Sequence, residues 1–181
     1  MRSRRSADYR CLDERVWGHP MRVSASTQVV APIDRVWGIV SDPERVLTFM
    51  SGVTRWEVAG DRRTGLGARY RILFRVGAAE LGGLIEVVEW EEPRELAWSS
   101  VTGVDQRGRW RLREMSPGRT RVELRMAYGV AGAGLWGWLA ERLAAPMVSG
   151  HLRRSLQQLK RLIEHEELRG RAAARRAART A

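Results

Sequence analysis

The chain has 181 residues, and its 44% hydrophobic content is enough for one domain with a core of its own. The formal net charge is +11, and arginine supplies nearly all of the positive charge, because Lys160 is the only lysine. No apolar run reaches the length of a membrane-spanning helix, and the single cysteine, Cys11, excludes an intramolecular disulfide; together these features favour a cytoplasmic protein.

The positive charge is partly concentrated at the two ends of the chain. Residues 1–22 and residues 165–181 each carry a net charge of +3, and the segment between them carries +5. Such a spread excess indicates a solvated face more than a nucleic-acid surface. Residues 1–22 lack periodicity and are expected to be a disordered basic leader, with Met21 as an alternative start of translation. Residues 12–20 are too polar for the core of a signal peptide.

The first structured part is expected to be a strand followed by two short helices. Residues 22–30 alternate as a strand, and Pro32 then opens a helix, since proline suits the first helical turn. Asp42 is the predicted N-cap of the second helix, and Pro43 its first residue. The apolar faces of the two helices comprise Ile33, Val36, Trp37 and Val40, then Val46, Leu47, Phe49 and Met50.

Six more strands are predicted after these helices. Alternation is clearest in the last two, which Ser116-Pro117-Gly118-Arg119 joins as a turn. Gly82-Gly83 predicts a bulge or bend. Alternation on one side only predicts an antiparallel sheet with one wet face. The six strands are expected over residues 53–59, 67–76, 80–91, 95–100, 107–115 and 120–128.

Residues 135–164 are predicted to form one long amphipathic helix. Pro146 is expected to kink this helix or to mark a boundary within it. The apolar face consists of Trp136, Leu139, Leu143 and Met147 before the kink, and of Val148, Leu152, Leu156, Leu159 and Ile163 after it. Residues 166–181 are rich in arginine and alanine and are expected to be a mobile tail.

Five stretches carry a resemblance to a known family. They are APIDRVW at 31–37, SDPE at 41–44, VVEWEEPREL at 87–96, and the segments 107–125 and 143–162. These residues resemble the START-like or SRPBCC superfamily, and within it the polyketide cyclase/dehydrase-like group, over about residues 23–165. The resemblance implies an α+β helix-grip fold, with a curved seven-stranded antiparallel sheet around the C-terminal helix, two short helices after the first strand, and a cavity. Members bind lipids, sterols, polyketides or other apolar molecules, and some act on them.

The sequence offers no recognisable catalytic or metal-binding set. The histidines are His19, His151 and His165, without the spacing of metal ligands, so neither a metal nor another cofactor is expected. His151 is either an acid/base group near the pocket or a histidine on the flank of the helix. Glu86 is a buried acid if its face is the inner one, and a solvated glutamate otherwise. The solvated alternative is preferred for both residues.

Aromatic residues are the strongest hint of a site. Eight tryptophans against two phenylalanines provide bulky apolar surfaces that suit either a core or a pocket wall. The candidate ligand-binding residues come from the inner faces of strands and the first half of the helix: Tyr70, Phe74, Trp98, Trp110, Met126, Tyr128, Trp136, Leu139, Leu143 and Met147.

Three functions remain open on the sequence alone. The first is binding of a hydrophobic small molecule, lipid or polyketide-like, in an internal cavity. The second is a cyclase, aromatase or dehydratase, which would need two titratable groups in the pocket. The third is an interaction module that uses the basic tails, with nucleic acid as a disfavoured partner. The ligand and the oligomeric state are not predicted.

Overall fold

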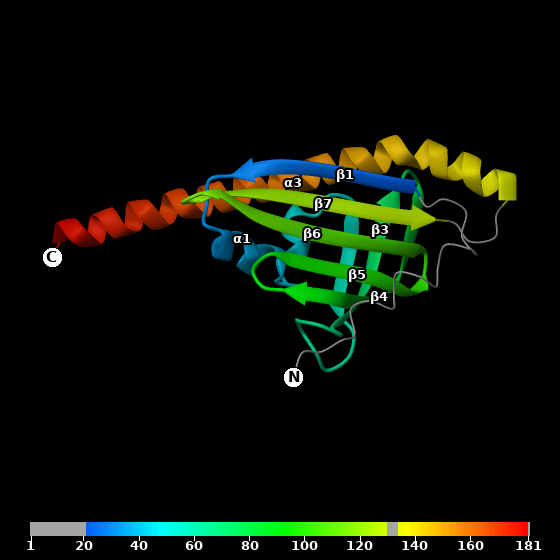
Figure 1. The fold of residues 1–181 in the computed structure, drawn as a ribbon, viewed down its shortest axis with the longest axis horizontal. Helices are drawn as coiled ribbons and strands as arrows, with labels where there is room; N and C mark the ends of the chain where they lie inside the picture. The colour runs from blue at the N-terminus through cyan, green and yellow to red at the C-terminus, as the bar shows by residue number, and fades with distance from the viewer. Residues whose placement is uncertain (1–20, 130–133, 181) are drawn as a thin grey trace.

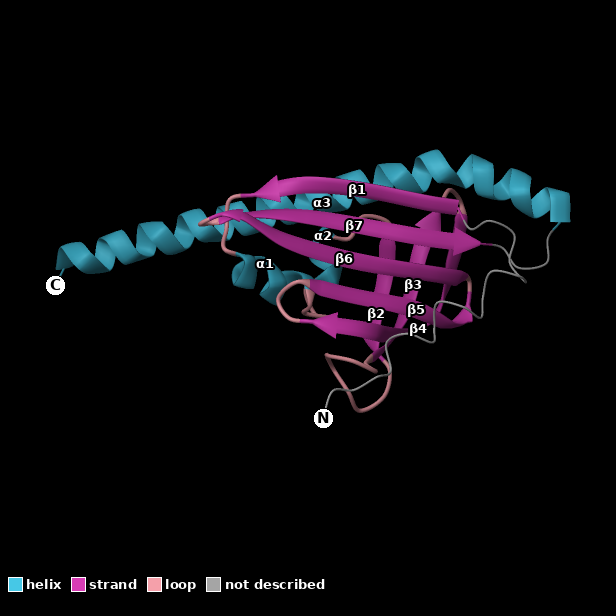
Figure 2. Cartoon of the chain, viewed as in Figure 1, coloured by secondary structure: helices cyan, strands magenta, loops and turns pink. Residues whose placement is uncertain are grey.

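The computed structural model describes residues 21–129 and 134–180 (Figure 1). Its strands form one antiparallel sheet in the order β1-β7-β6-β5-β4-β3-β2, and the long helix α3 runs beside it (Figure 2). This confirms the α+β layout expected from the sequence. The elements are β1 (Met21–Val29), α1 (Ile33–Val40), α2 (Val46–Phe49), β2 (Val53–Val58), β3 (Arg69–Val76), β4 (Ala79–Glu91), β5 (Glu95–Gly103), β6 (Asp105–Ser116), β7 (Arg119–Gly129) and α3 (Gly134–Thr180).

The core lies between the concave face of the sheet and the helices. Along β6, for example, Trp110 and Leu112 are buried while Arg113 is exposed, as the alternation predicts. From α3, a stripe at helical spacing joins the same core: Leu152, Leu156, Leu159 and Ile163. The apolar inner face of the sheet and this stripe therefore keep each other from water.

A bulge in β4 changes which residues face inward. Ile85 and Val87 are buried, but the pairing with β5 shifts between Val87 and Glu89, so that Val88 is an extra residue and is 53% exposed. Beyond the bulge, Trp90 points inward and contacts Trp37 edge-on, with ring centroids 5.0 Å apart. The sequence located the bulge at Gly82-Gly83, whereas the shifts in register follow that pair.

The convex face of the sheet holds the charges of the central segment in ion pairs. Arg109 bridges Glu89 and Glu95, at 2.6 and 2.5 Å, and Arg111 reaches Glu95 at 3.0 Å. Glu86 lies on this face and pairs with Arg69 at 2.7 Å, which supports the solvated alternative for this glutamate. Exposed pairs contribute little to stability, so their main effect is to neutralise arginines along the strands.

The second short helix begins later than the sequence predicts. Pro43 and Glu44 belong to a turn, and α2 begins only at Val46, with Arg45 as its N-cap residue. The Asp42 carboxylate accepts a hydrogen bond from the backbone N–H of Glu44 at 2.9 Å. Asp42 therefore caps this turn instead of the helix, since a short acidic side chain serves either kind of backbone equally well.

Helix α3 continues to Thr180, past residue 164, where the sequence predicts its end. It also passes through Pro146, and Figure 1 shows its axis bending along the yellow-to-orange stretch. Residues 168–179 are exposed and extend beyond the sheet as the orange-to-red end of the helix. The arginine- and alanine-rich segment is therefore helical in this structure.

Two contacts attach the end of β1 to α3. The Glu164 carboxylate accepts hydrogen bonds from the backbone N–H of Val30 at 3.0 Å and from the Lys160 ammonium at 2.8 Å. Burial opposes ionisation of Glu164, but these hydrogen bonds outweigh it and lower its pKa. The same Lys160 donates to the carbonyl of Gln28 at 2.7 Å. The only lysine of the chain thus fixes the first strand against the last helix.

Gly108 makes room for the indole ring of Trp98. The two residues pair across β5 and β6, and a Cβ added at Gly108 would lie 2.0 Å from Cζ2 of Trp98. Such a distance is far inside van der Waals contact, and the obstacle is a rigid ring in a packed core. A side chain at position 108 is therefore incompatible with the present position of Trp98.

Substitution Gly108→Ala should displace Trp98 and lower the free energy of unfolding by about 1–3 kcal/mol. Gly38→Ala is the control, because Gly38 is an exposed helical residue with open space at its Cβ. That change should raise stability by up to about 1 kcal/mol. Urea denaturation of the three proteins measures both effects, and equal stability of Gly108→Ala and wild type would contradict this account of the packing.

Candidate functional site

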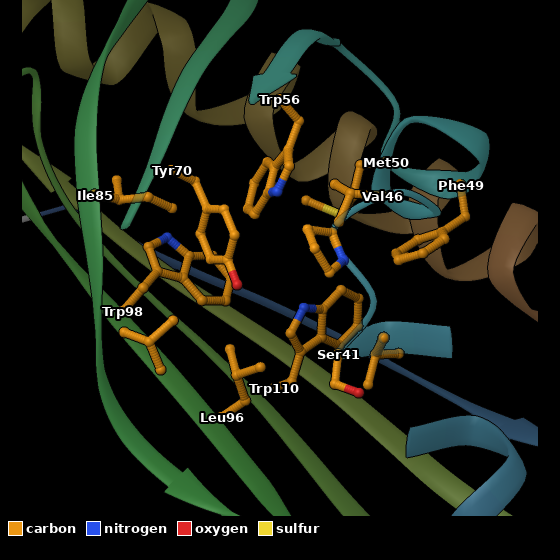
Figure 3. Close-up of a pocket in the computed structure, with 13 residues that line it drawn as sticks. Ser41, Val46, Phe49, Met50, Trp56, Tyr70, Ile85, Leu96, Trp98 and Trp110 are labelled. Carbon is orange, nitrogen blue, oxygen red and sulfur yellow. The ribbon is translucent and has the colours of Figure 1, made fainter. Parts of the chain in front are cut away.

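A small cavity lies between the α1–α2 segment and the inner face of the sheet (Figure 3). Its volume is about 30 Å³, which is room for a water molecule or two and far less than the several hundred Å³ of a typical ligand site. Its lining residues are Val40, Ser41, Pro43, Val46, Phe49, Met50, Trp56, Tyr70, Ile85, Val87, Leu96, Trp98 and Trp110.

The α1–α2 segment forms one wall because it crosses over the sheet with its apolar side inward. Phe49 is fully buried and meets Trp110 edge-on, with ring centroids 6.1 Å apart. Pro43 and Val46 are buried, and Met50, just after α2, is partly buried. The thioether of Met50 is unbranched and flexible, so it can adapt to occupants of different shape.

Strands β2 to β6 form the opposite wall, which is largely aromatic. Trp56 of β2 packs on Tyr70 of β3 with ring centroids 5.1 Å apart and ring planes inclined by 32°. Trp98 and Trp110 come from β5 and β6, and Figure 3 shows their indole rings among the side chains that surround the cavity. Large flat surfaces on several sides suit a flat or apolar occupant.

The polar groups of the cavity are few and uncharged. Ser41 Oγ donates to the carbonyl of Trp37 at 2.7 Å, and the Tyr70 hydroxyl donates to the carbonyl of Arg63 at 2.7 Å. Burial raises the pKa of Tyr70 to about 12, although the nearby Arg63 opposes this shift and Asp42 adds to it. The phenol therefore keeps its proton, and its hydrogen bond, at neutral pH.

Three of the ten wall residues expected from the sequence line this cavity: Tyr70, Trp98 and Trp110. Phe74, Met126 and Tyr128 are partly buried residues of β3 and β7 outside the lining. Met147 is 39% exposed, and its methyl group lies near Gly77, in the turn between β3 and β4. The side chains of Trp136, Leu139 and Leu143 lie outside what the structure describes.

The residues that sequence reasoning missed come mainly from the α1–α2 segment. Val46, Phe49 and Met50 had been assigned to the apolar side of a helix, but not to a pocket wall. Trp56 alternates with charged residues in β2, which was a sufficient signal for an inward position.

His151 fixes the loop that follows α2. Its Nδ1 lies 3.0 Å from Ser51 Oγ, and the Ser51 backbone N–H donates to Ser155 Oγ at 2.9 Å. Gly52 fits against the imidazole, since a Cβ there would lie 2.7 Å from Nδ1. Partial burial and the nearby Arg154 lower the pKa of His151. The imidazole is not among the lining residues of the cavity, and its described contacts are with the loop after α2 and with Arg154.

Across the residues that the structure describes, no group of histidine, cysteine, aspartate and glutamate side chains could hold a metal ion. Over the same part of the chain, no helix is both long enough and apolar enough to cross a membrane.

Residues 20–164 match the model of one protein family, described as polyketide cyclase / dehydrase and lipid transport. The chain belongs to this family. The match ends at the residue with which α3 contacts the end of β1, so it covers the sheet, the short helices and the packed part of α3. The family resemblance read from the sequence is thereby confirmed.

Solved structures share the fold at low sequence identity. TTHA0849 from Thermus thermophilus is 22% identical with a TM-score of 0.68, over 79% of this chain and 97% of that one. The Zhui aromatase/cyclase from Streptomyces sp. R1128 is 20% identical with a TM-score of 0.66, over 81% and 94%. A START superfamily protein from Mycobacterium smegmatis is 17% identical with a TM-score of 0.63, over 80% and 99%. The helix-grip fold of the START superfamily is therefore established for this chain.

One curated relative is more similar in sequence. Uncharacterized protein Rv0088 from Mycobacterium tuberculosis is 32% identical in an alignment of 126 residues that covers 63% of this chain. The alignment covers 50% of that protein, so the chain spans about half the length of its relative.

The raised pKa of Tyr70 predicts how stability changes in alkali. Between pH 10 and about 12 the unfolded chain loses the phenolic proton while the folded chain keeps it, so the free energy of unfolding should fall as the pH rises through this window. In Tyr70→Phe that part of the pH dependence should disappear. Tyrosinate absorbance at high pH reads the titration directly, and completion for all three tyrosines of the folded wild type by pH 11 would contradict the assignment.

Proposed function

We propose that this protein binds a hydrophobic small molecule, lipid or polyketide-like, in the cavity between the α1–α2 segment and the sheet. The observation that carries the proposal is the lining, which combines five aromatic side chains with aliphatic ones and contains no charged residue among those that the structure describes. Burying apolar ligand surface against such walls contributes about 25 cal/mol per Å². The family to which the chain belongs supports a ligand-binding fold of this type.

Binding requires the cavity to widen, because about 30 Å³ cannot hold a molecule of that class. The α1–α2 segment is the part to move, since it lines the cavity and is held at its outer side by ion pairs. Glu44 pairs with Arg63 of the loop before β3, and Arg45 pairs with Glu166 of α3. Both pairs are accessible to water and are therefore weak enough to exchange.

The catalytic alternative receives less support from the lining. Cyclisation or dehydration requires groups that move protons at the substrate. Among the lining residues, Tyr70 is the ionisable side chain, its proton is engaged by the Arg63 carbonyl, and its pKa is raised to about 12. A phenol of that pKa is poorly matched to proton transfer near neutral pH, so binding is the function that we put forward.

The arginine-rich end of α3 does not enter the proposal. Its exposed residues follow Glu167 on the part of the helix that extends beyond the sheet, away from the cavity (Figure 1). An interaction of these arginines with an anionic partner would be a separate property, sensitive to salt and to removal of residues 166–181.

Protein purified without denaturation should retain an apolar compound or accept a neutral dye such as Nile red. Native mass spectrometry detects the former, and the dye's emission detects the latter. Substitution Val46→Phe, which narrows the cavity from the α1–α2 side, should weaken dye binding at least tenfold, because it removes space that a ligand needs. The proposal would be refuted if the purified protein contained no apolar compound and also did not change the emission of the dye.

Loosening the α1–α2 segment should change the kinetics of binding. In Arg45→Gln, which lacks the ion pair with Glu166, association and dissociation of the dye should both become about two- to tenfold faster, with a smaller change in affinity. The control is Arg75→Gln, which removes an exposed ion pair with Glu80 between β3 and β4, away from the α1–α2 segment and from the lining. Stopped-flow fluorescence distinguishes them, and equal rates in both variants would show that this segment does not control entry.

A further inference from the structure

One fully buried polar atom of the described cavity lining has no hydrogen-bond partner. Among the described residues, the indole nitrogen of Trp56 is completely buried and donates to no acceptor. Figure 3 shows this nitrogen on the edge of the ring directed toward the space among the other lining side chains. A buried donor without an acceptor is costly in a folded protein and is rarely left so unless something else fills the place.

The two hydroxyl groups of the lining have used their protons. The hydroxyls of Ser41 and Tyr70 both donate to backbone carbonyls, so toward an occupant they present lone pairs only. The edge of the Trp56 ring is therefore a place where a ligand oxygen can accept a hydrogen bond without displacing an existing one.

The lining also restricts the charge and shape of the occupant. None of the described lining residues carries a charge, so an ionised carboxylate, phosphate or ammonium group would be buried among them without a counterion. Both walls present aromatic rings. Phe49 comes from the α1–α2 segment and meets Trp110 of the sheet, where Trp56 also packs on Tyr70. Flat conjugated rings stack well on such surfaces, whereas a flexible alkyl chain would gain less and lose more conformational freedom.

We propose that the Trp56 N–H is the group that orients the ligand, and that the ligand is an uncharged, flat ring compound with a carbonyl oxygen at its edge. This inference rests on the proposed function, because it names the chemical class that the same cavity takes. Trp56 determines specificity here: it donates one hydrogen bond to the carbonyl oxygen, and the remaining walls supply apolar contact.

A pair of probes of the same shape tests the inference. 9-Fluorenone and fluorene share one ring skeleton and differ at a single carbon, which bears the carbonyl oxygen in the ketone and two hydrogens in the hydrocarbon. Each is titrated against Nile red in wild type and in Trp56→Phe. Water solvates the ketone better than the hydrocarbon. The quantity to compare between wild type and Trp56→Phe is therefore the ratio of the affinity for fluorenone to the affinity for fluorene.

In Trp56→Phe the preference for fluorenone over fluorene should fall about tenfold, through weaker fluorenone binding. Phe49→Leu is the control: it removes aromatic surface from another lining position that has no hydrogen-bonding group, and should weaken both probes while preserving their ratio. An unchanged ratio in Trp56→Phe would overturn the role of the N–H and leave the binding function standing. Failure of wild type to bind either probe, or the dye, would instead defeat the proposed function.

A wild-type measurement covers the case in which Trp56→Phe does not fold. In a proton–nitrogen spectrum, the indole N–H resonance of Trp56, whose ring packs on Tyr70, should move downfield when fluorenone is added and should not move downfield when fluorene is added. If both probes shift that resonance alike, a water or no acceptor occupies the position, and the inference is wrong.

Discussion

The concave face of the sheet is apolar from β1 at one edge to β2 at the other, so it must be covered from water. Two separate pieces of the chain cover it together, since α3 contributes a stripe of leucines and an isoleucine, and the short α1–α2 segment lies over β2 to β6. A single helix is only about 10 Å wide, so one element cannot cover the whole face. The cavity lies between the α1–α2 segment and the sheet, so its position follows from the fact that this segment covers β2 to β6.

The alternation in β5, β6 and β7 was sufficient to predict the strands and the inward position of Trp98 and Trp110, because a half-buried strand repeats every two residues. The bulge at Val88 was not predictable, since a single extra residue leaves no local signal and yet decides that Trp90 faces inward. Gly108 was passed over for a similar reason. Its role depends on a ring in the neighbouring strand, and the sequence does not show which residues are paired.

The location of the cavity required tertiary information for another reason. Helical periodicity marks the apolar sides of α1 and α2 but does not say which part of the sheet each covers. The first half of α3 was expected to form a wall, whereas no α3 residue whose side chain the structure describes lines the cavity. The inward position of Trp56 was readable from its alternation, whereas the lack of an acceptor for its N–H could be seen only once every neighbour was placed.

The aromatic lining has an optical consequence. Trp56, Trp98 and Trp110 surround the cavity, and Tyr70 lies against Trp56. Three of the eight tryptophans of the chain are thus emitters in contact with any occupant. A conjugated guest that absorbs in the near ultraviolet would accept their excitation over these short distances, so the native fluorescence of the protein reports occupancy without a label.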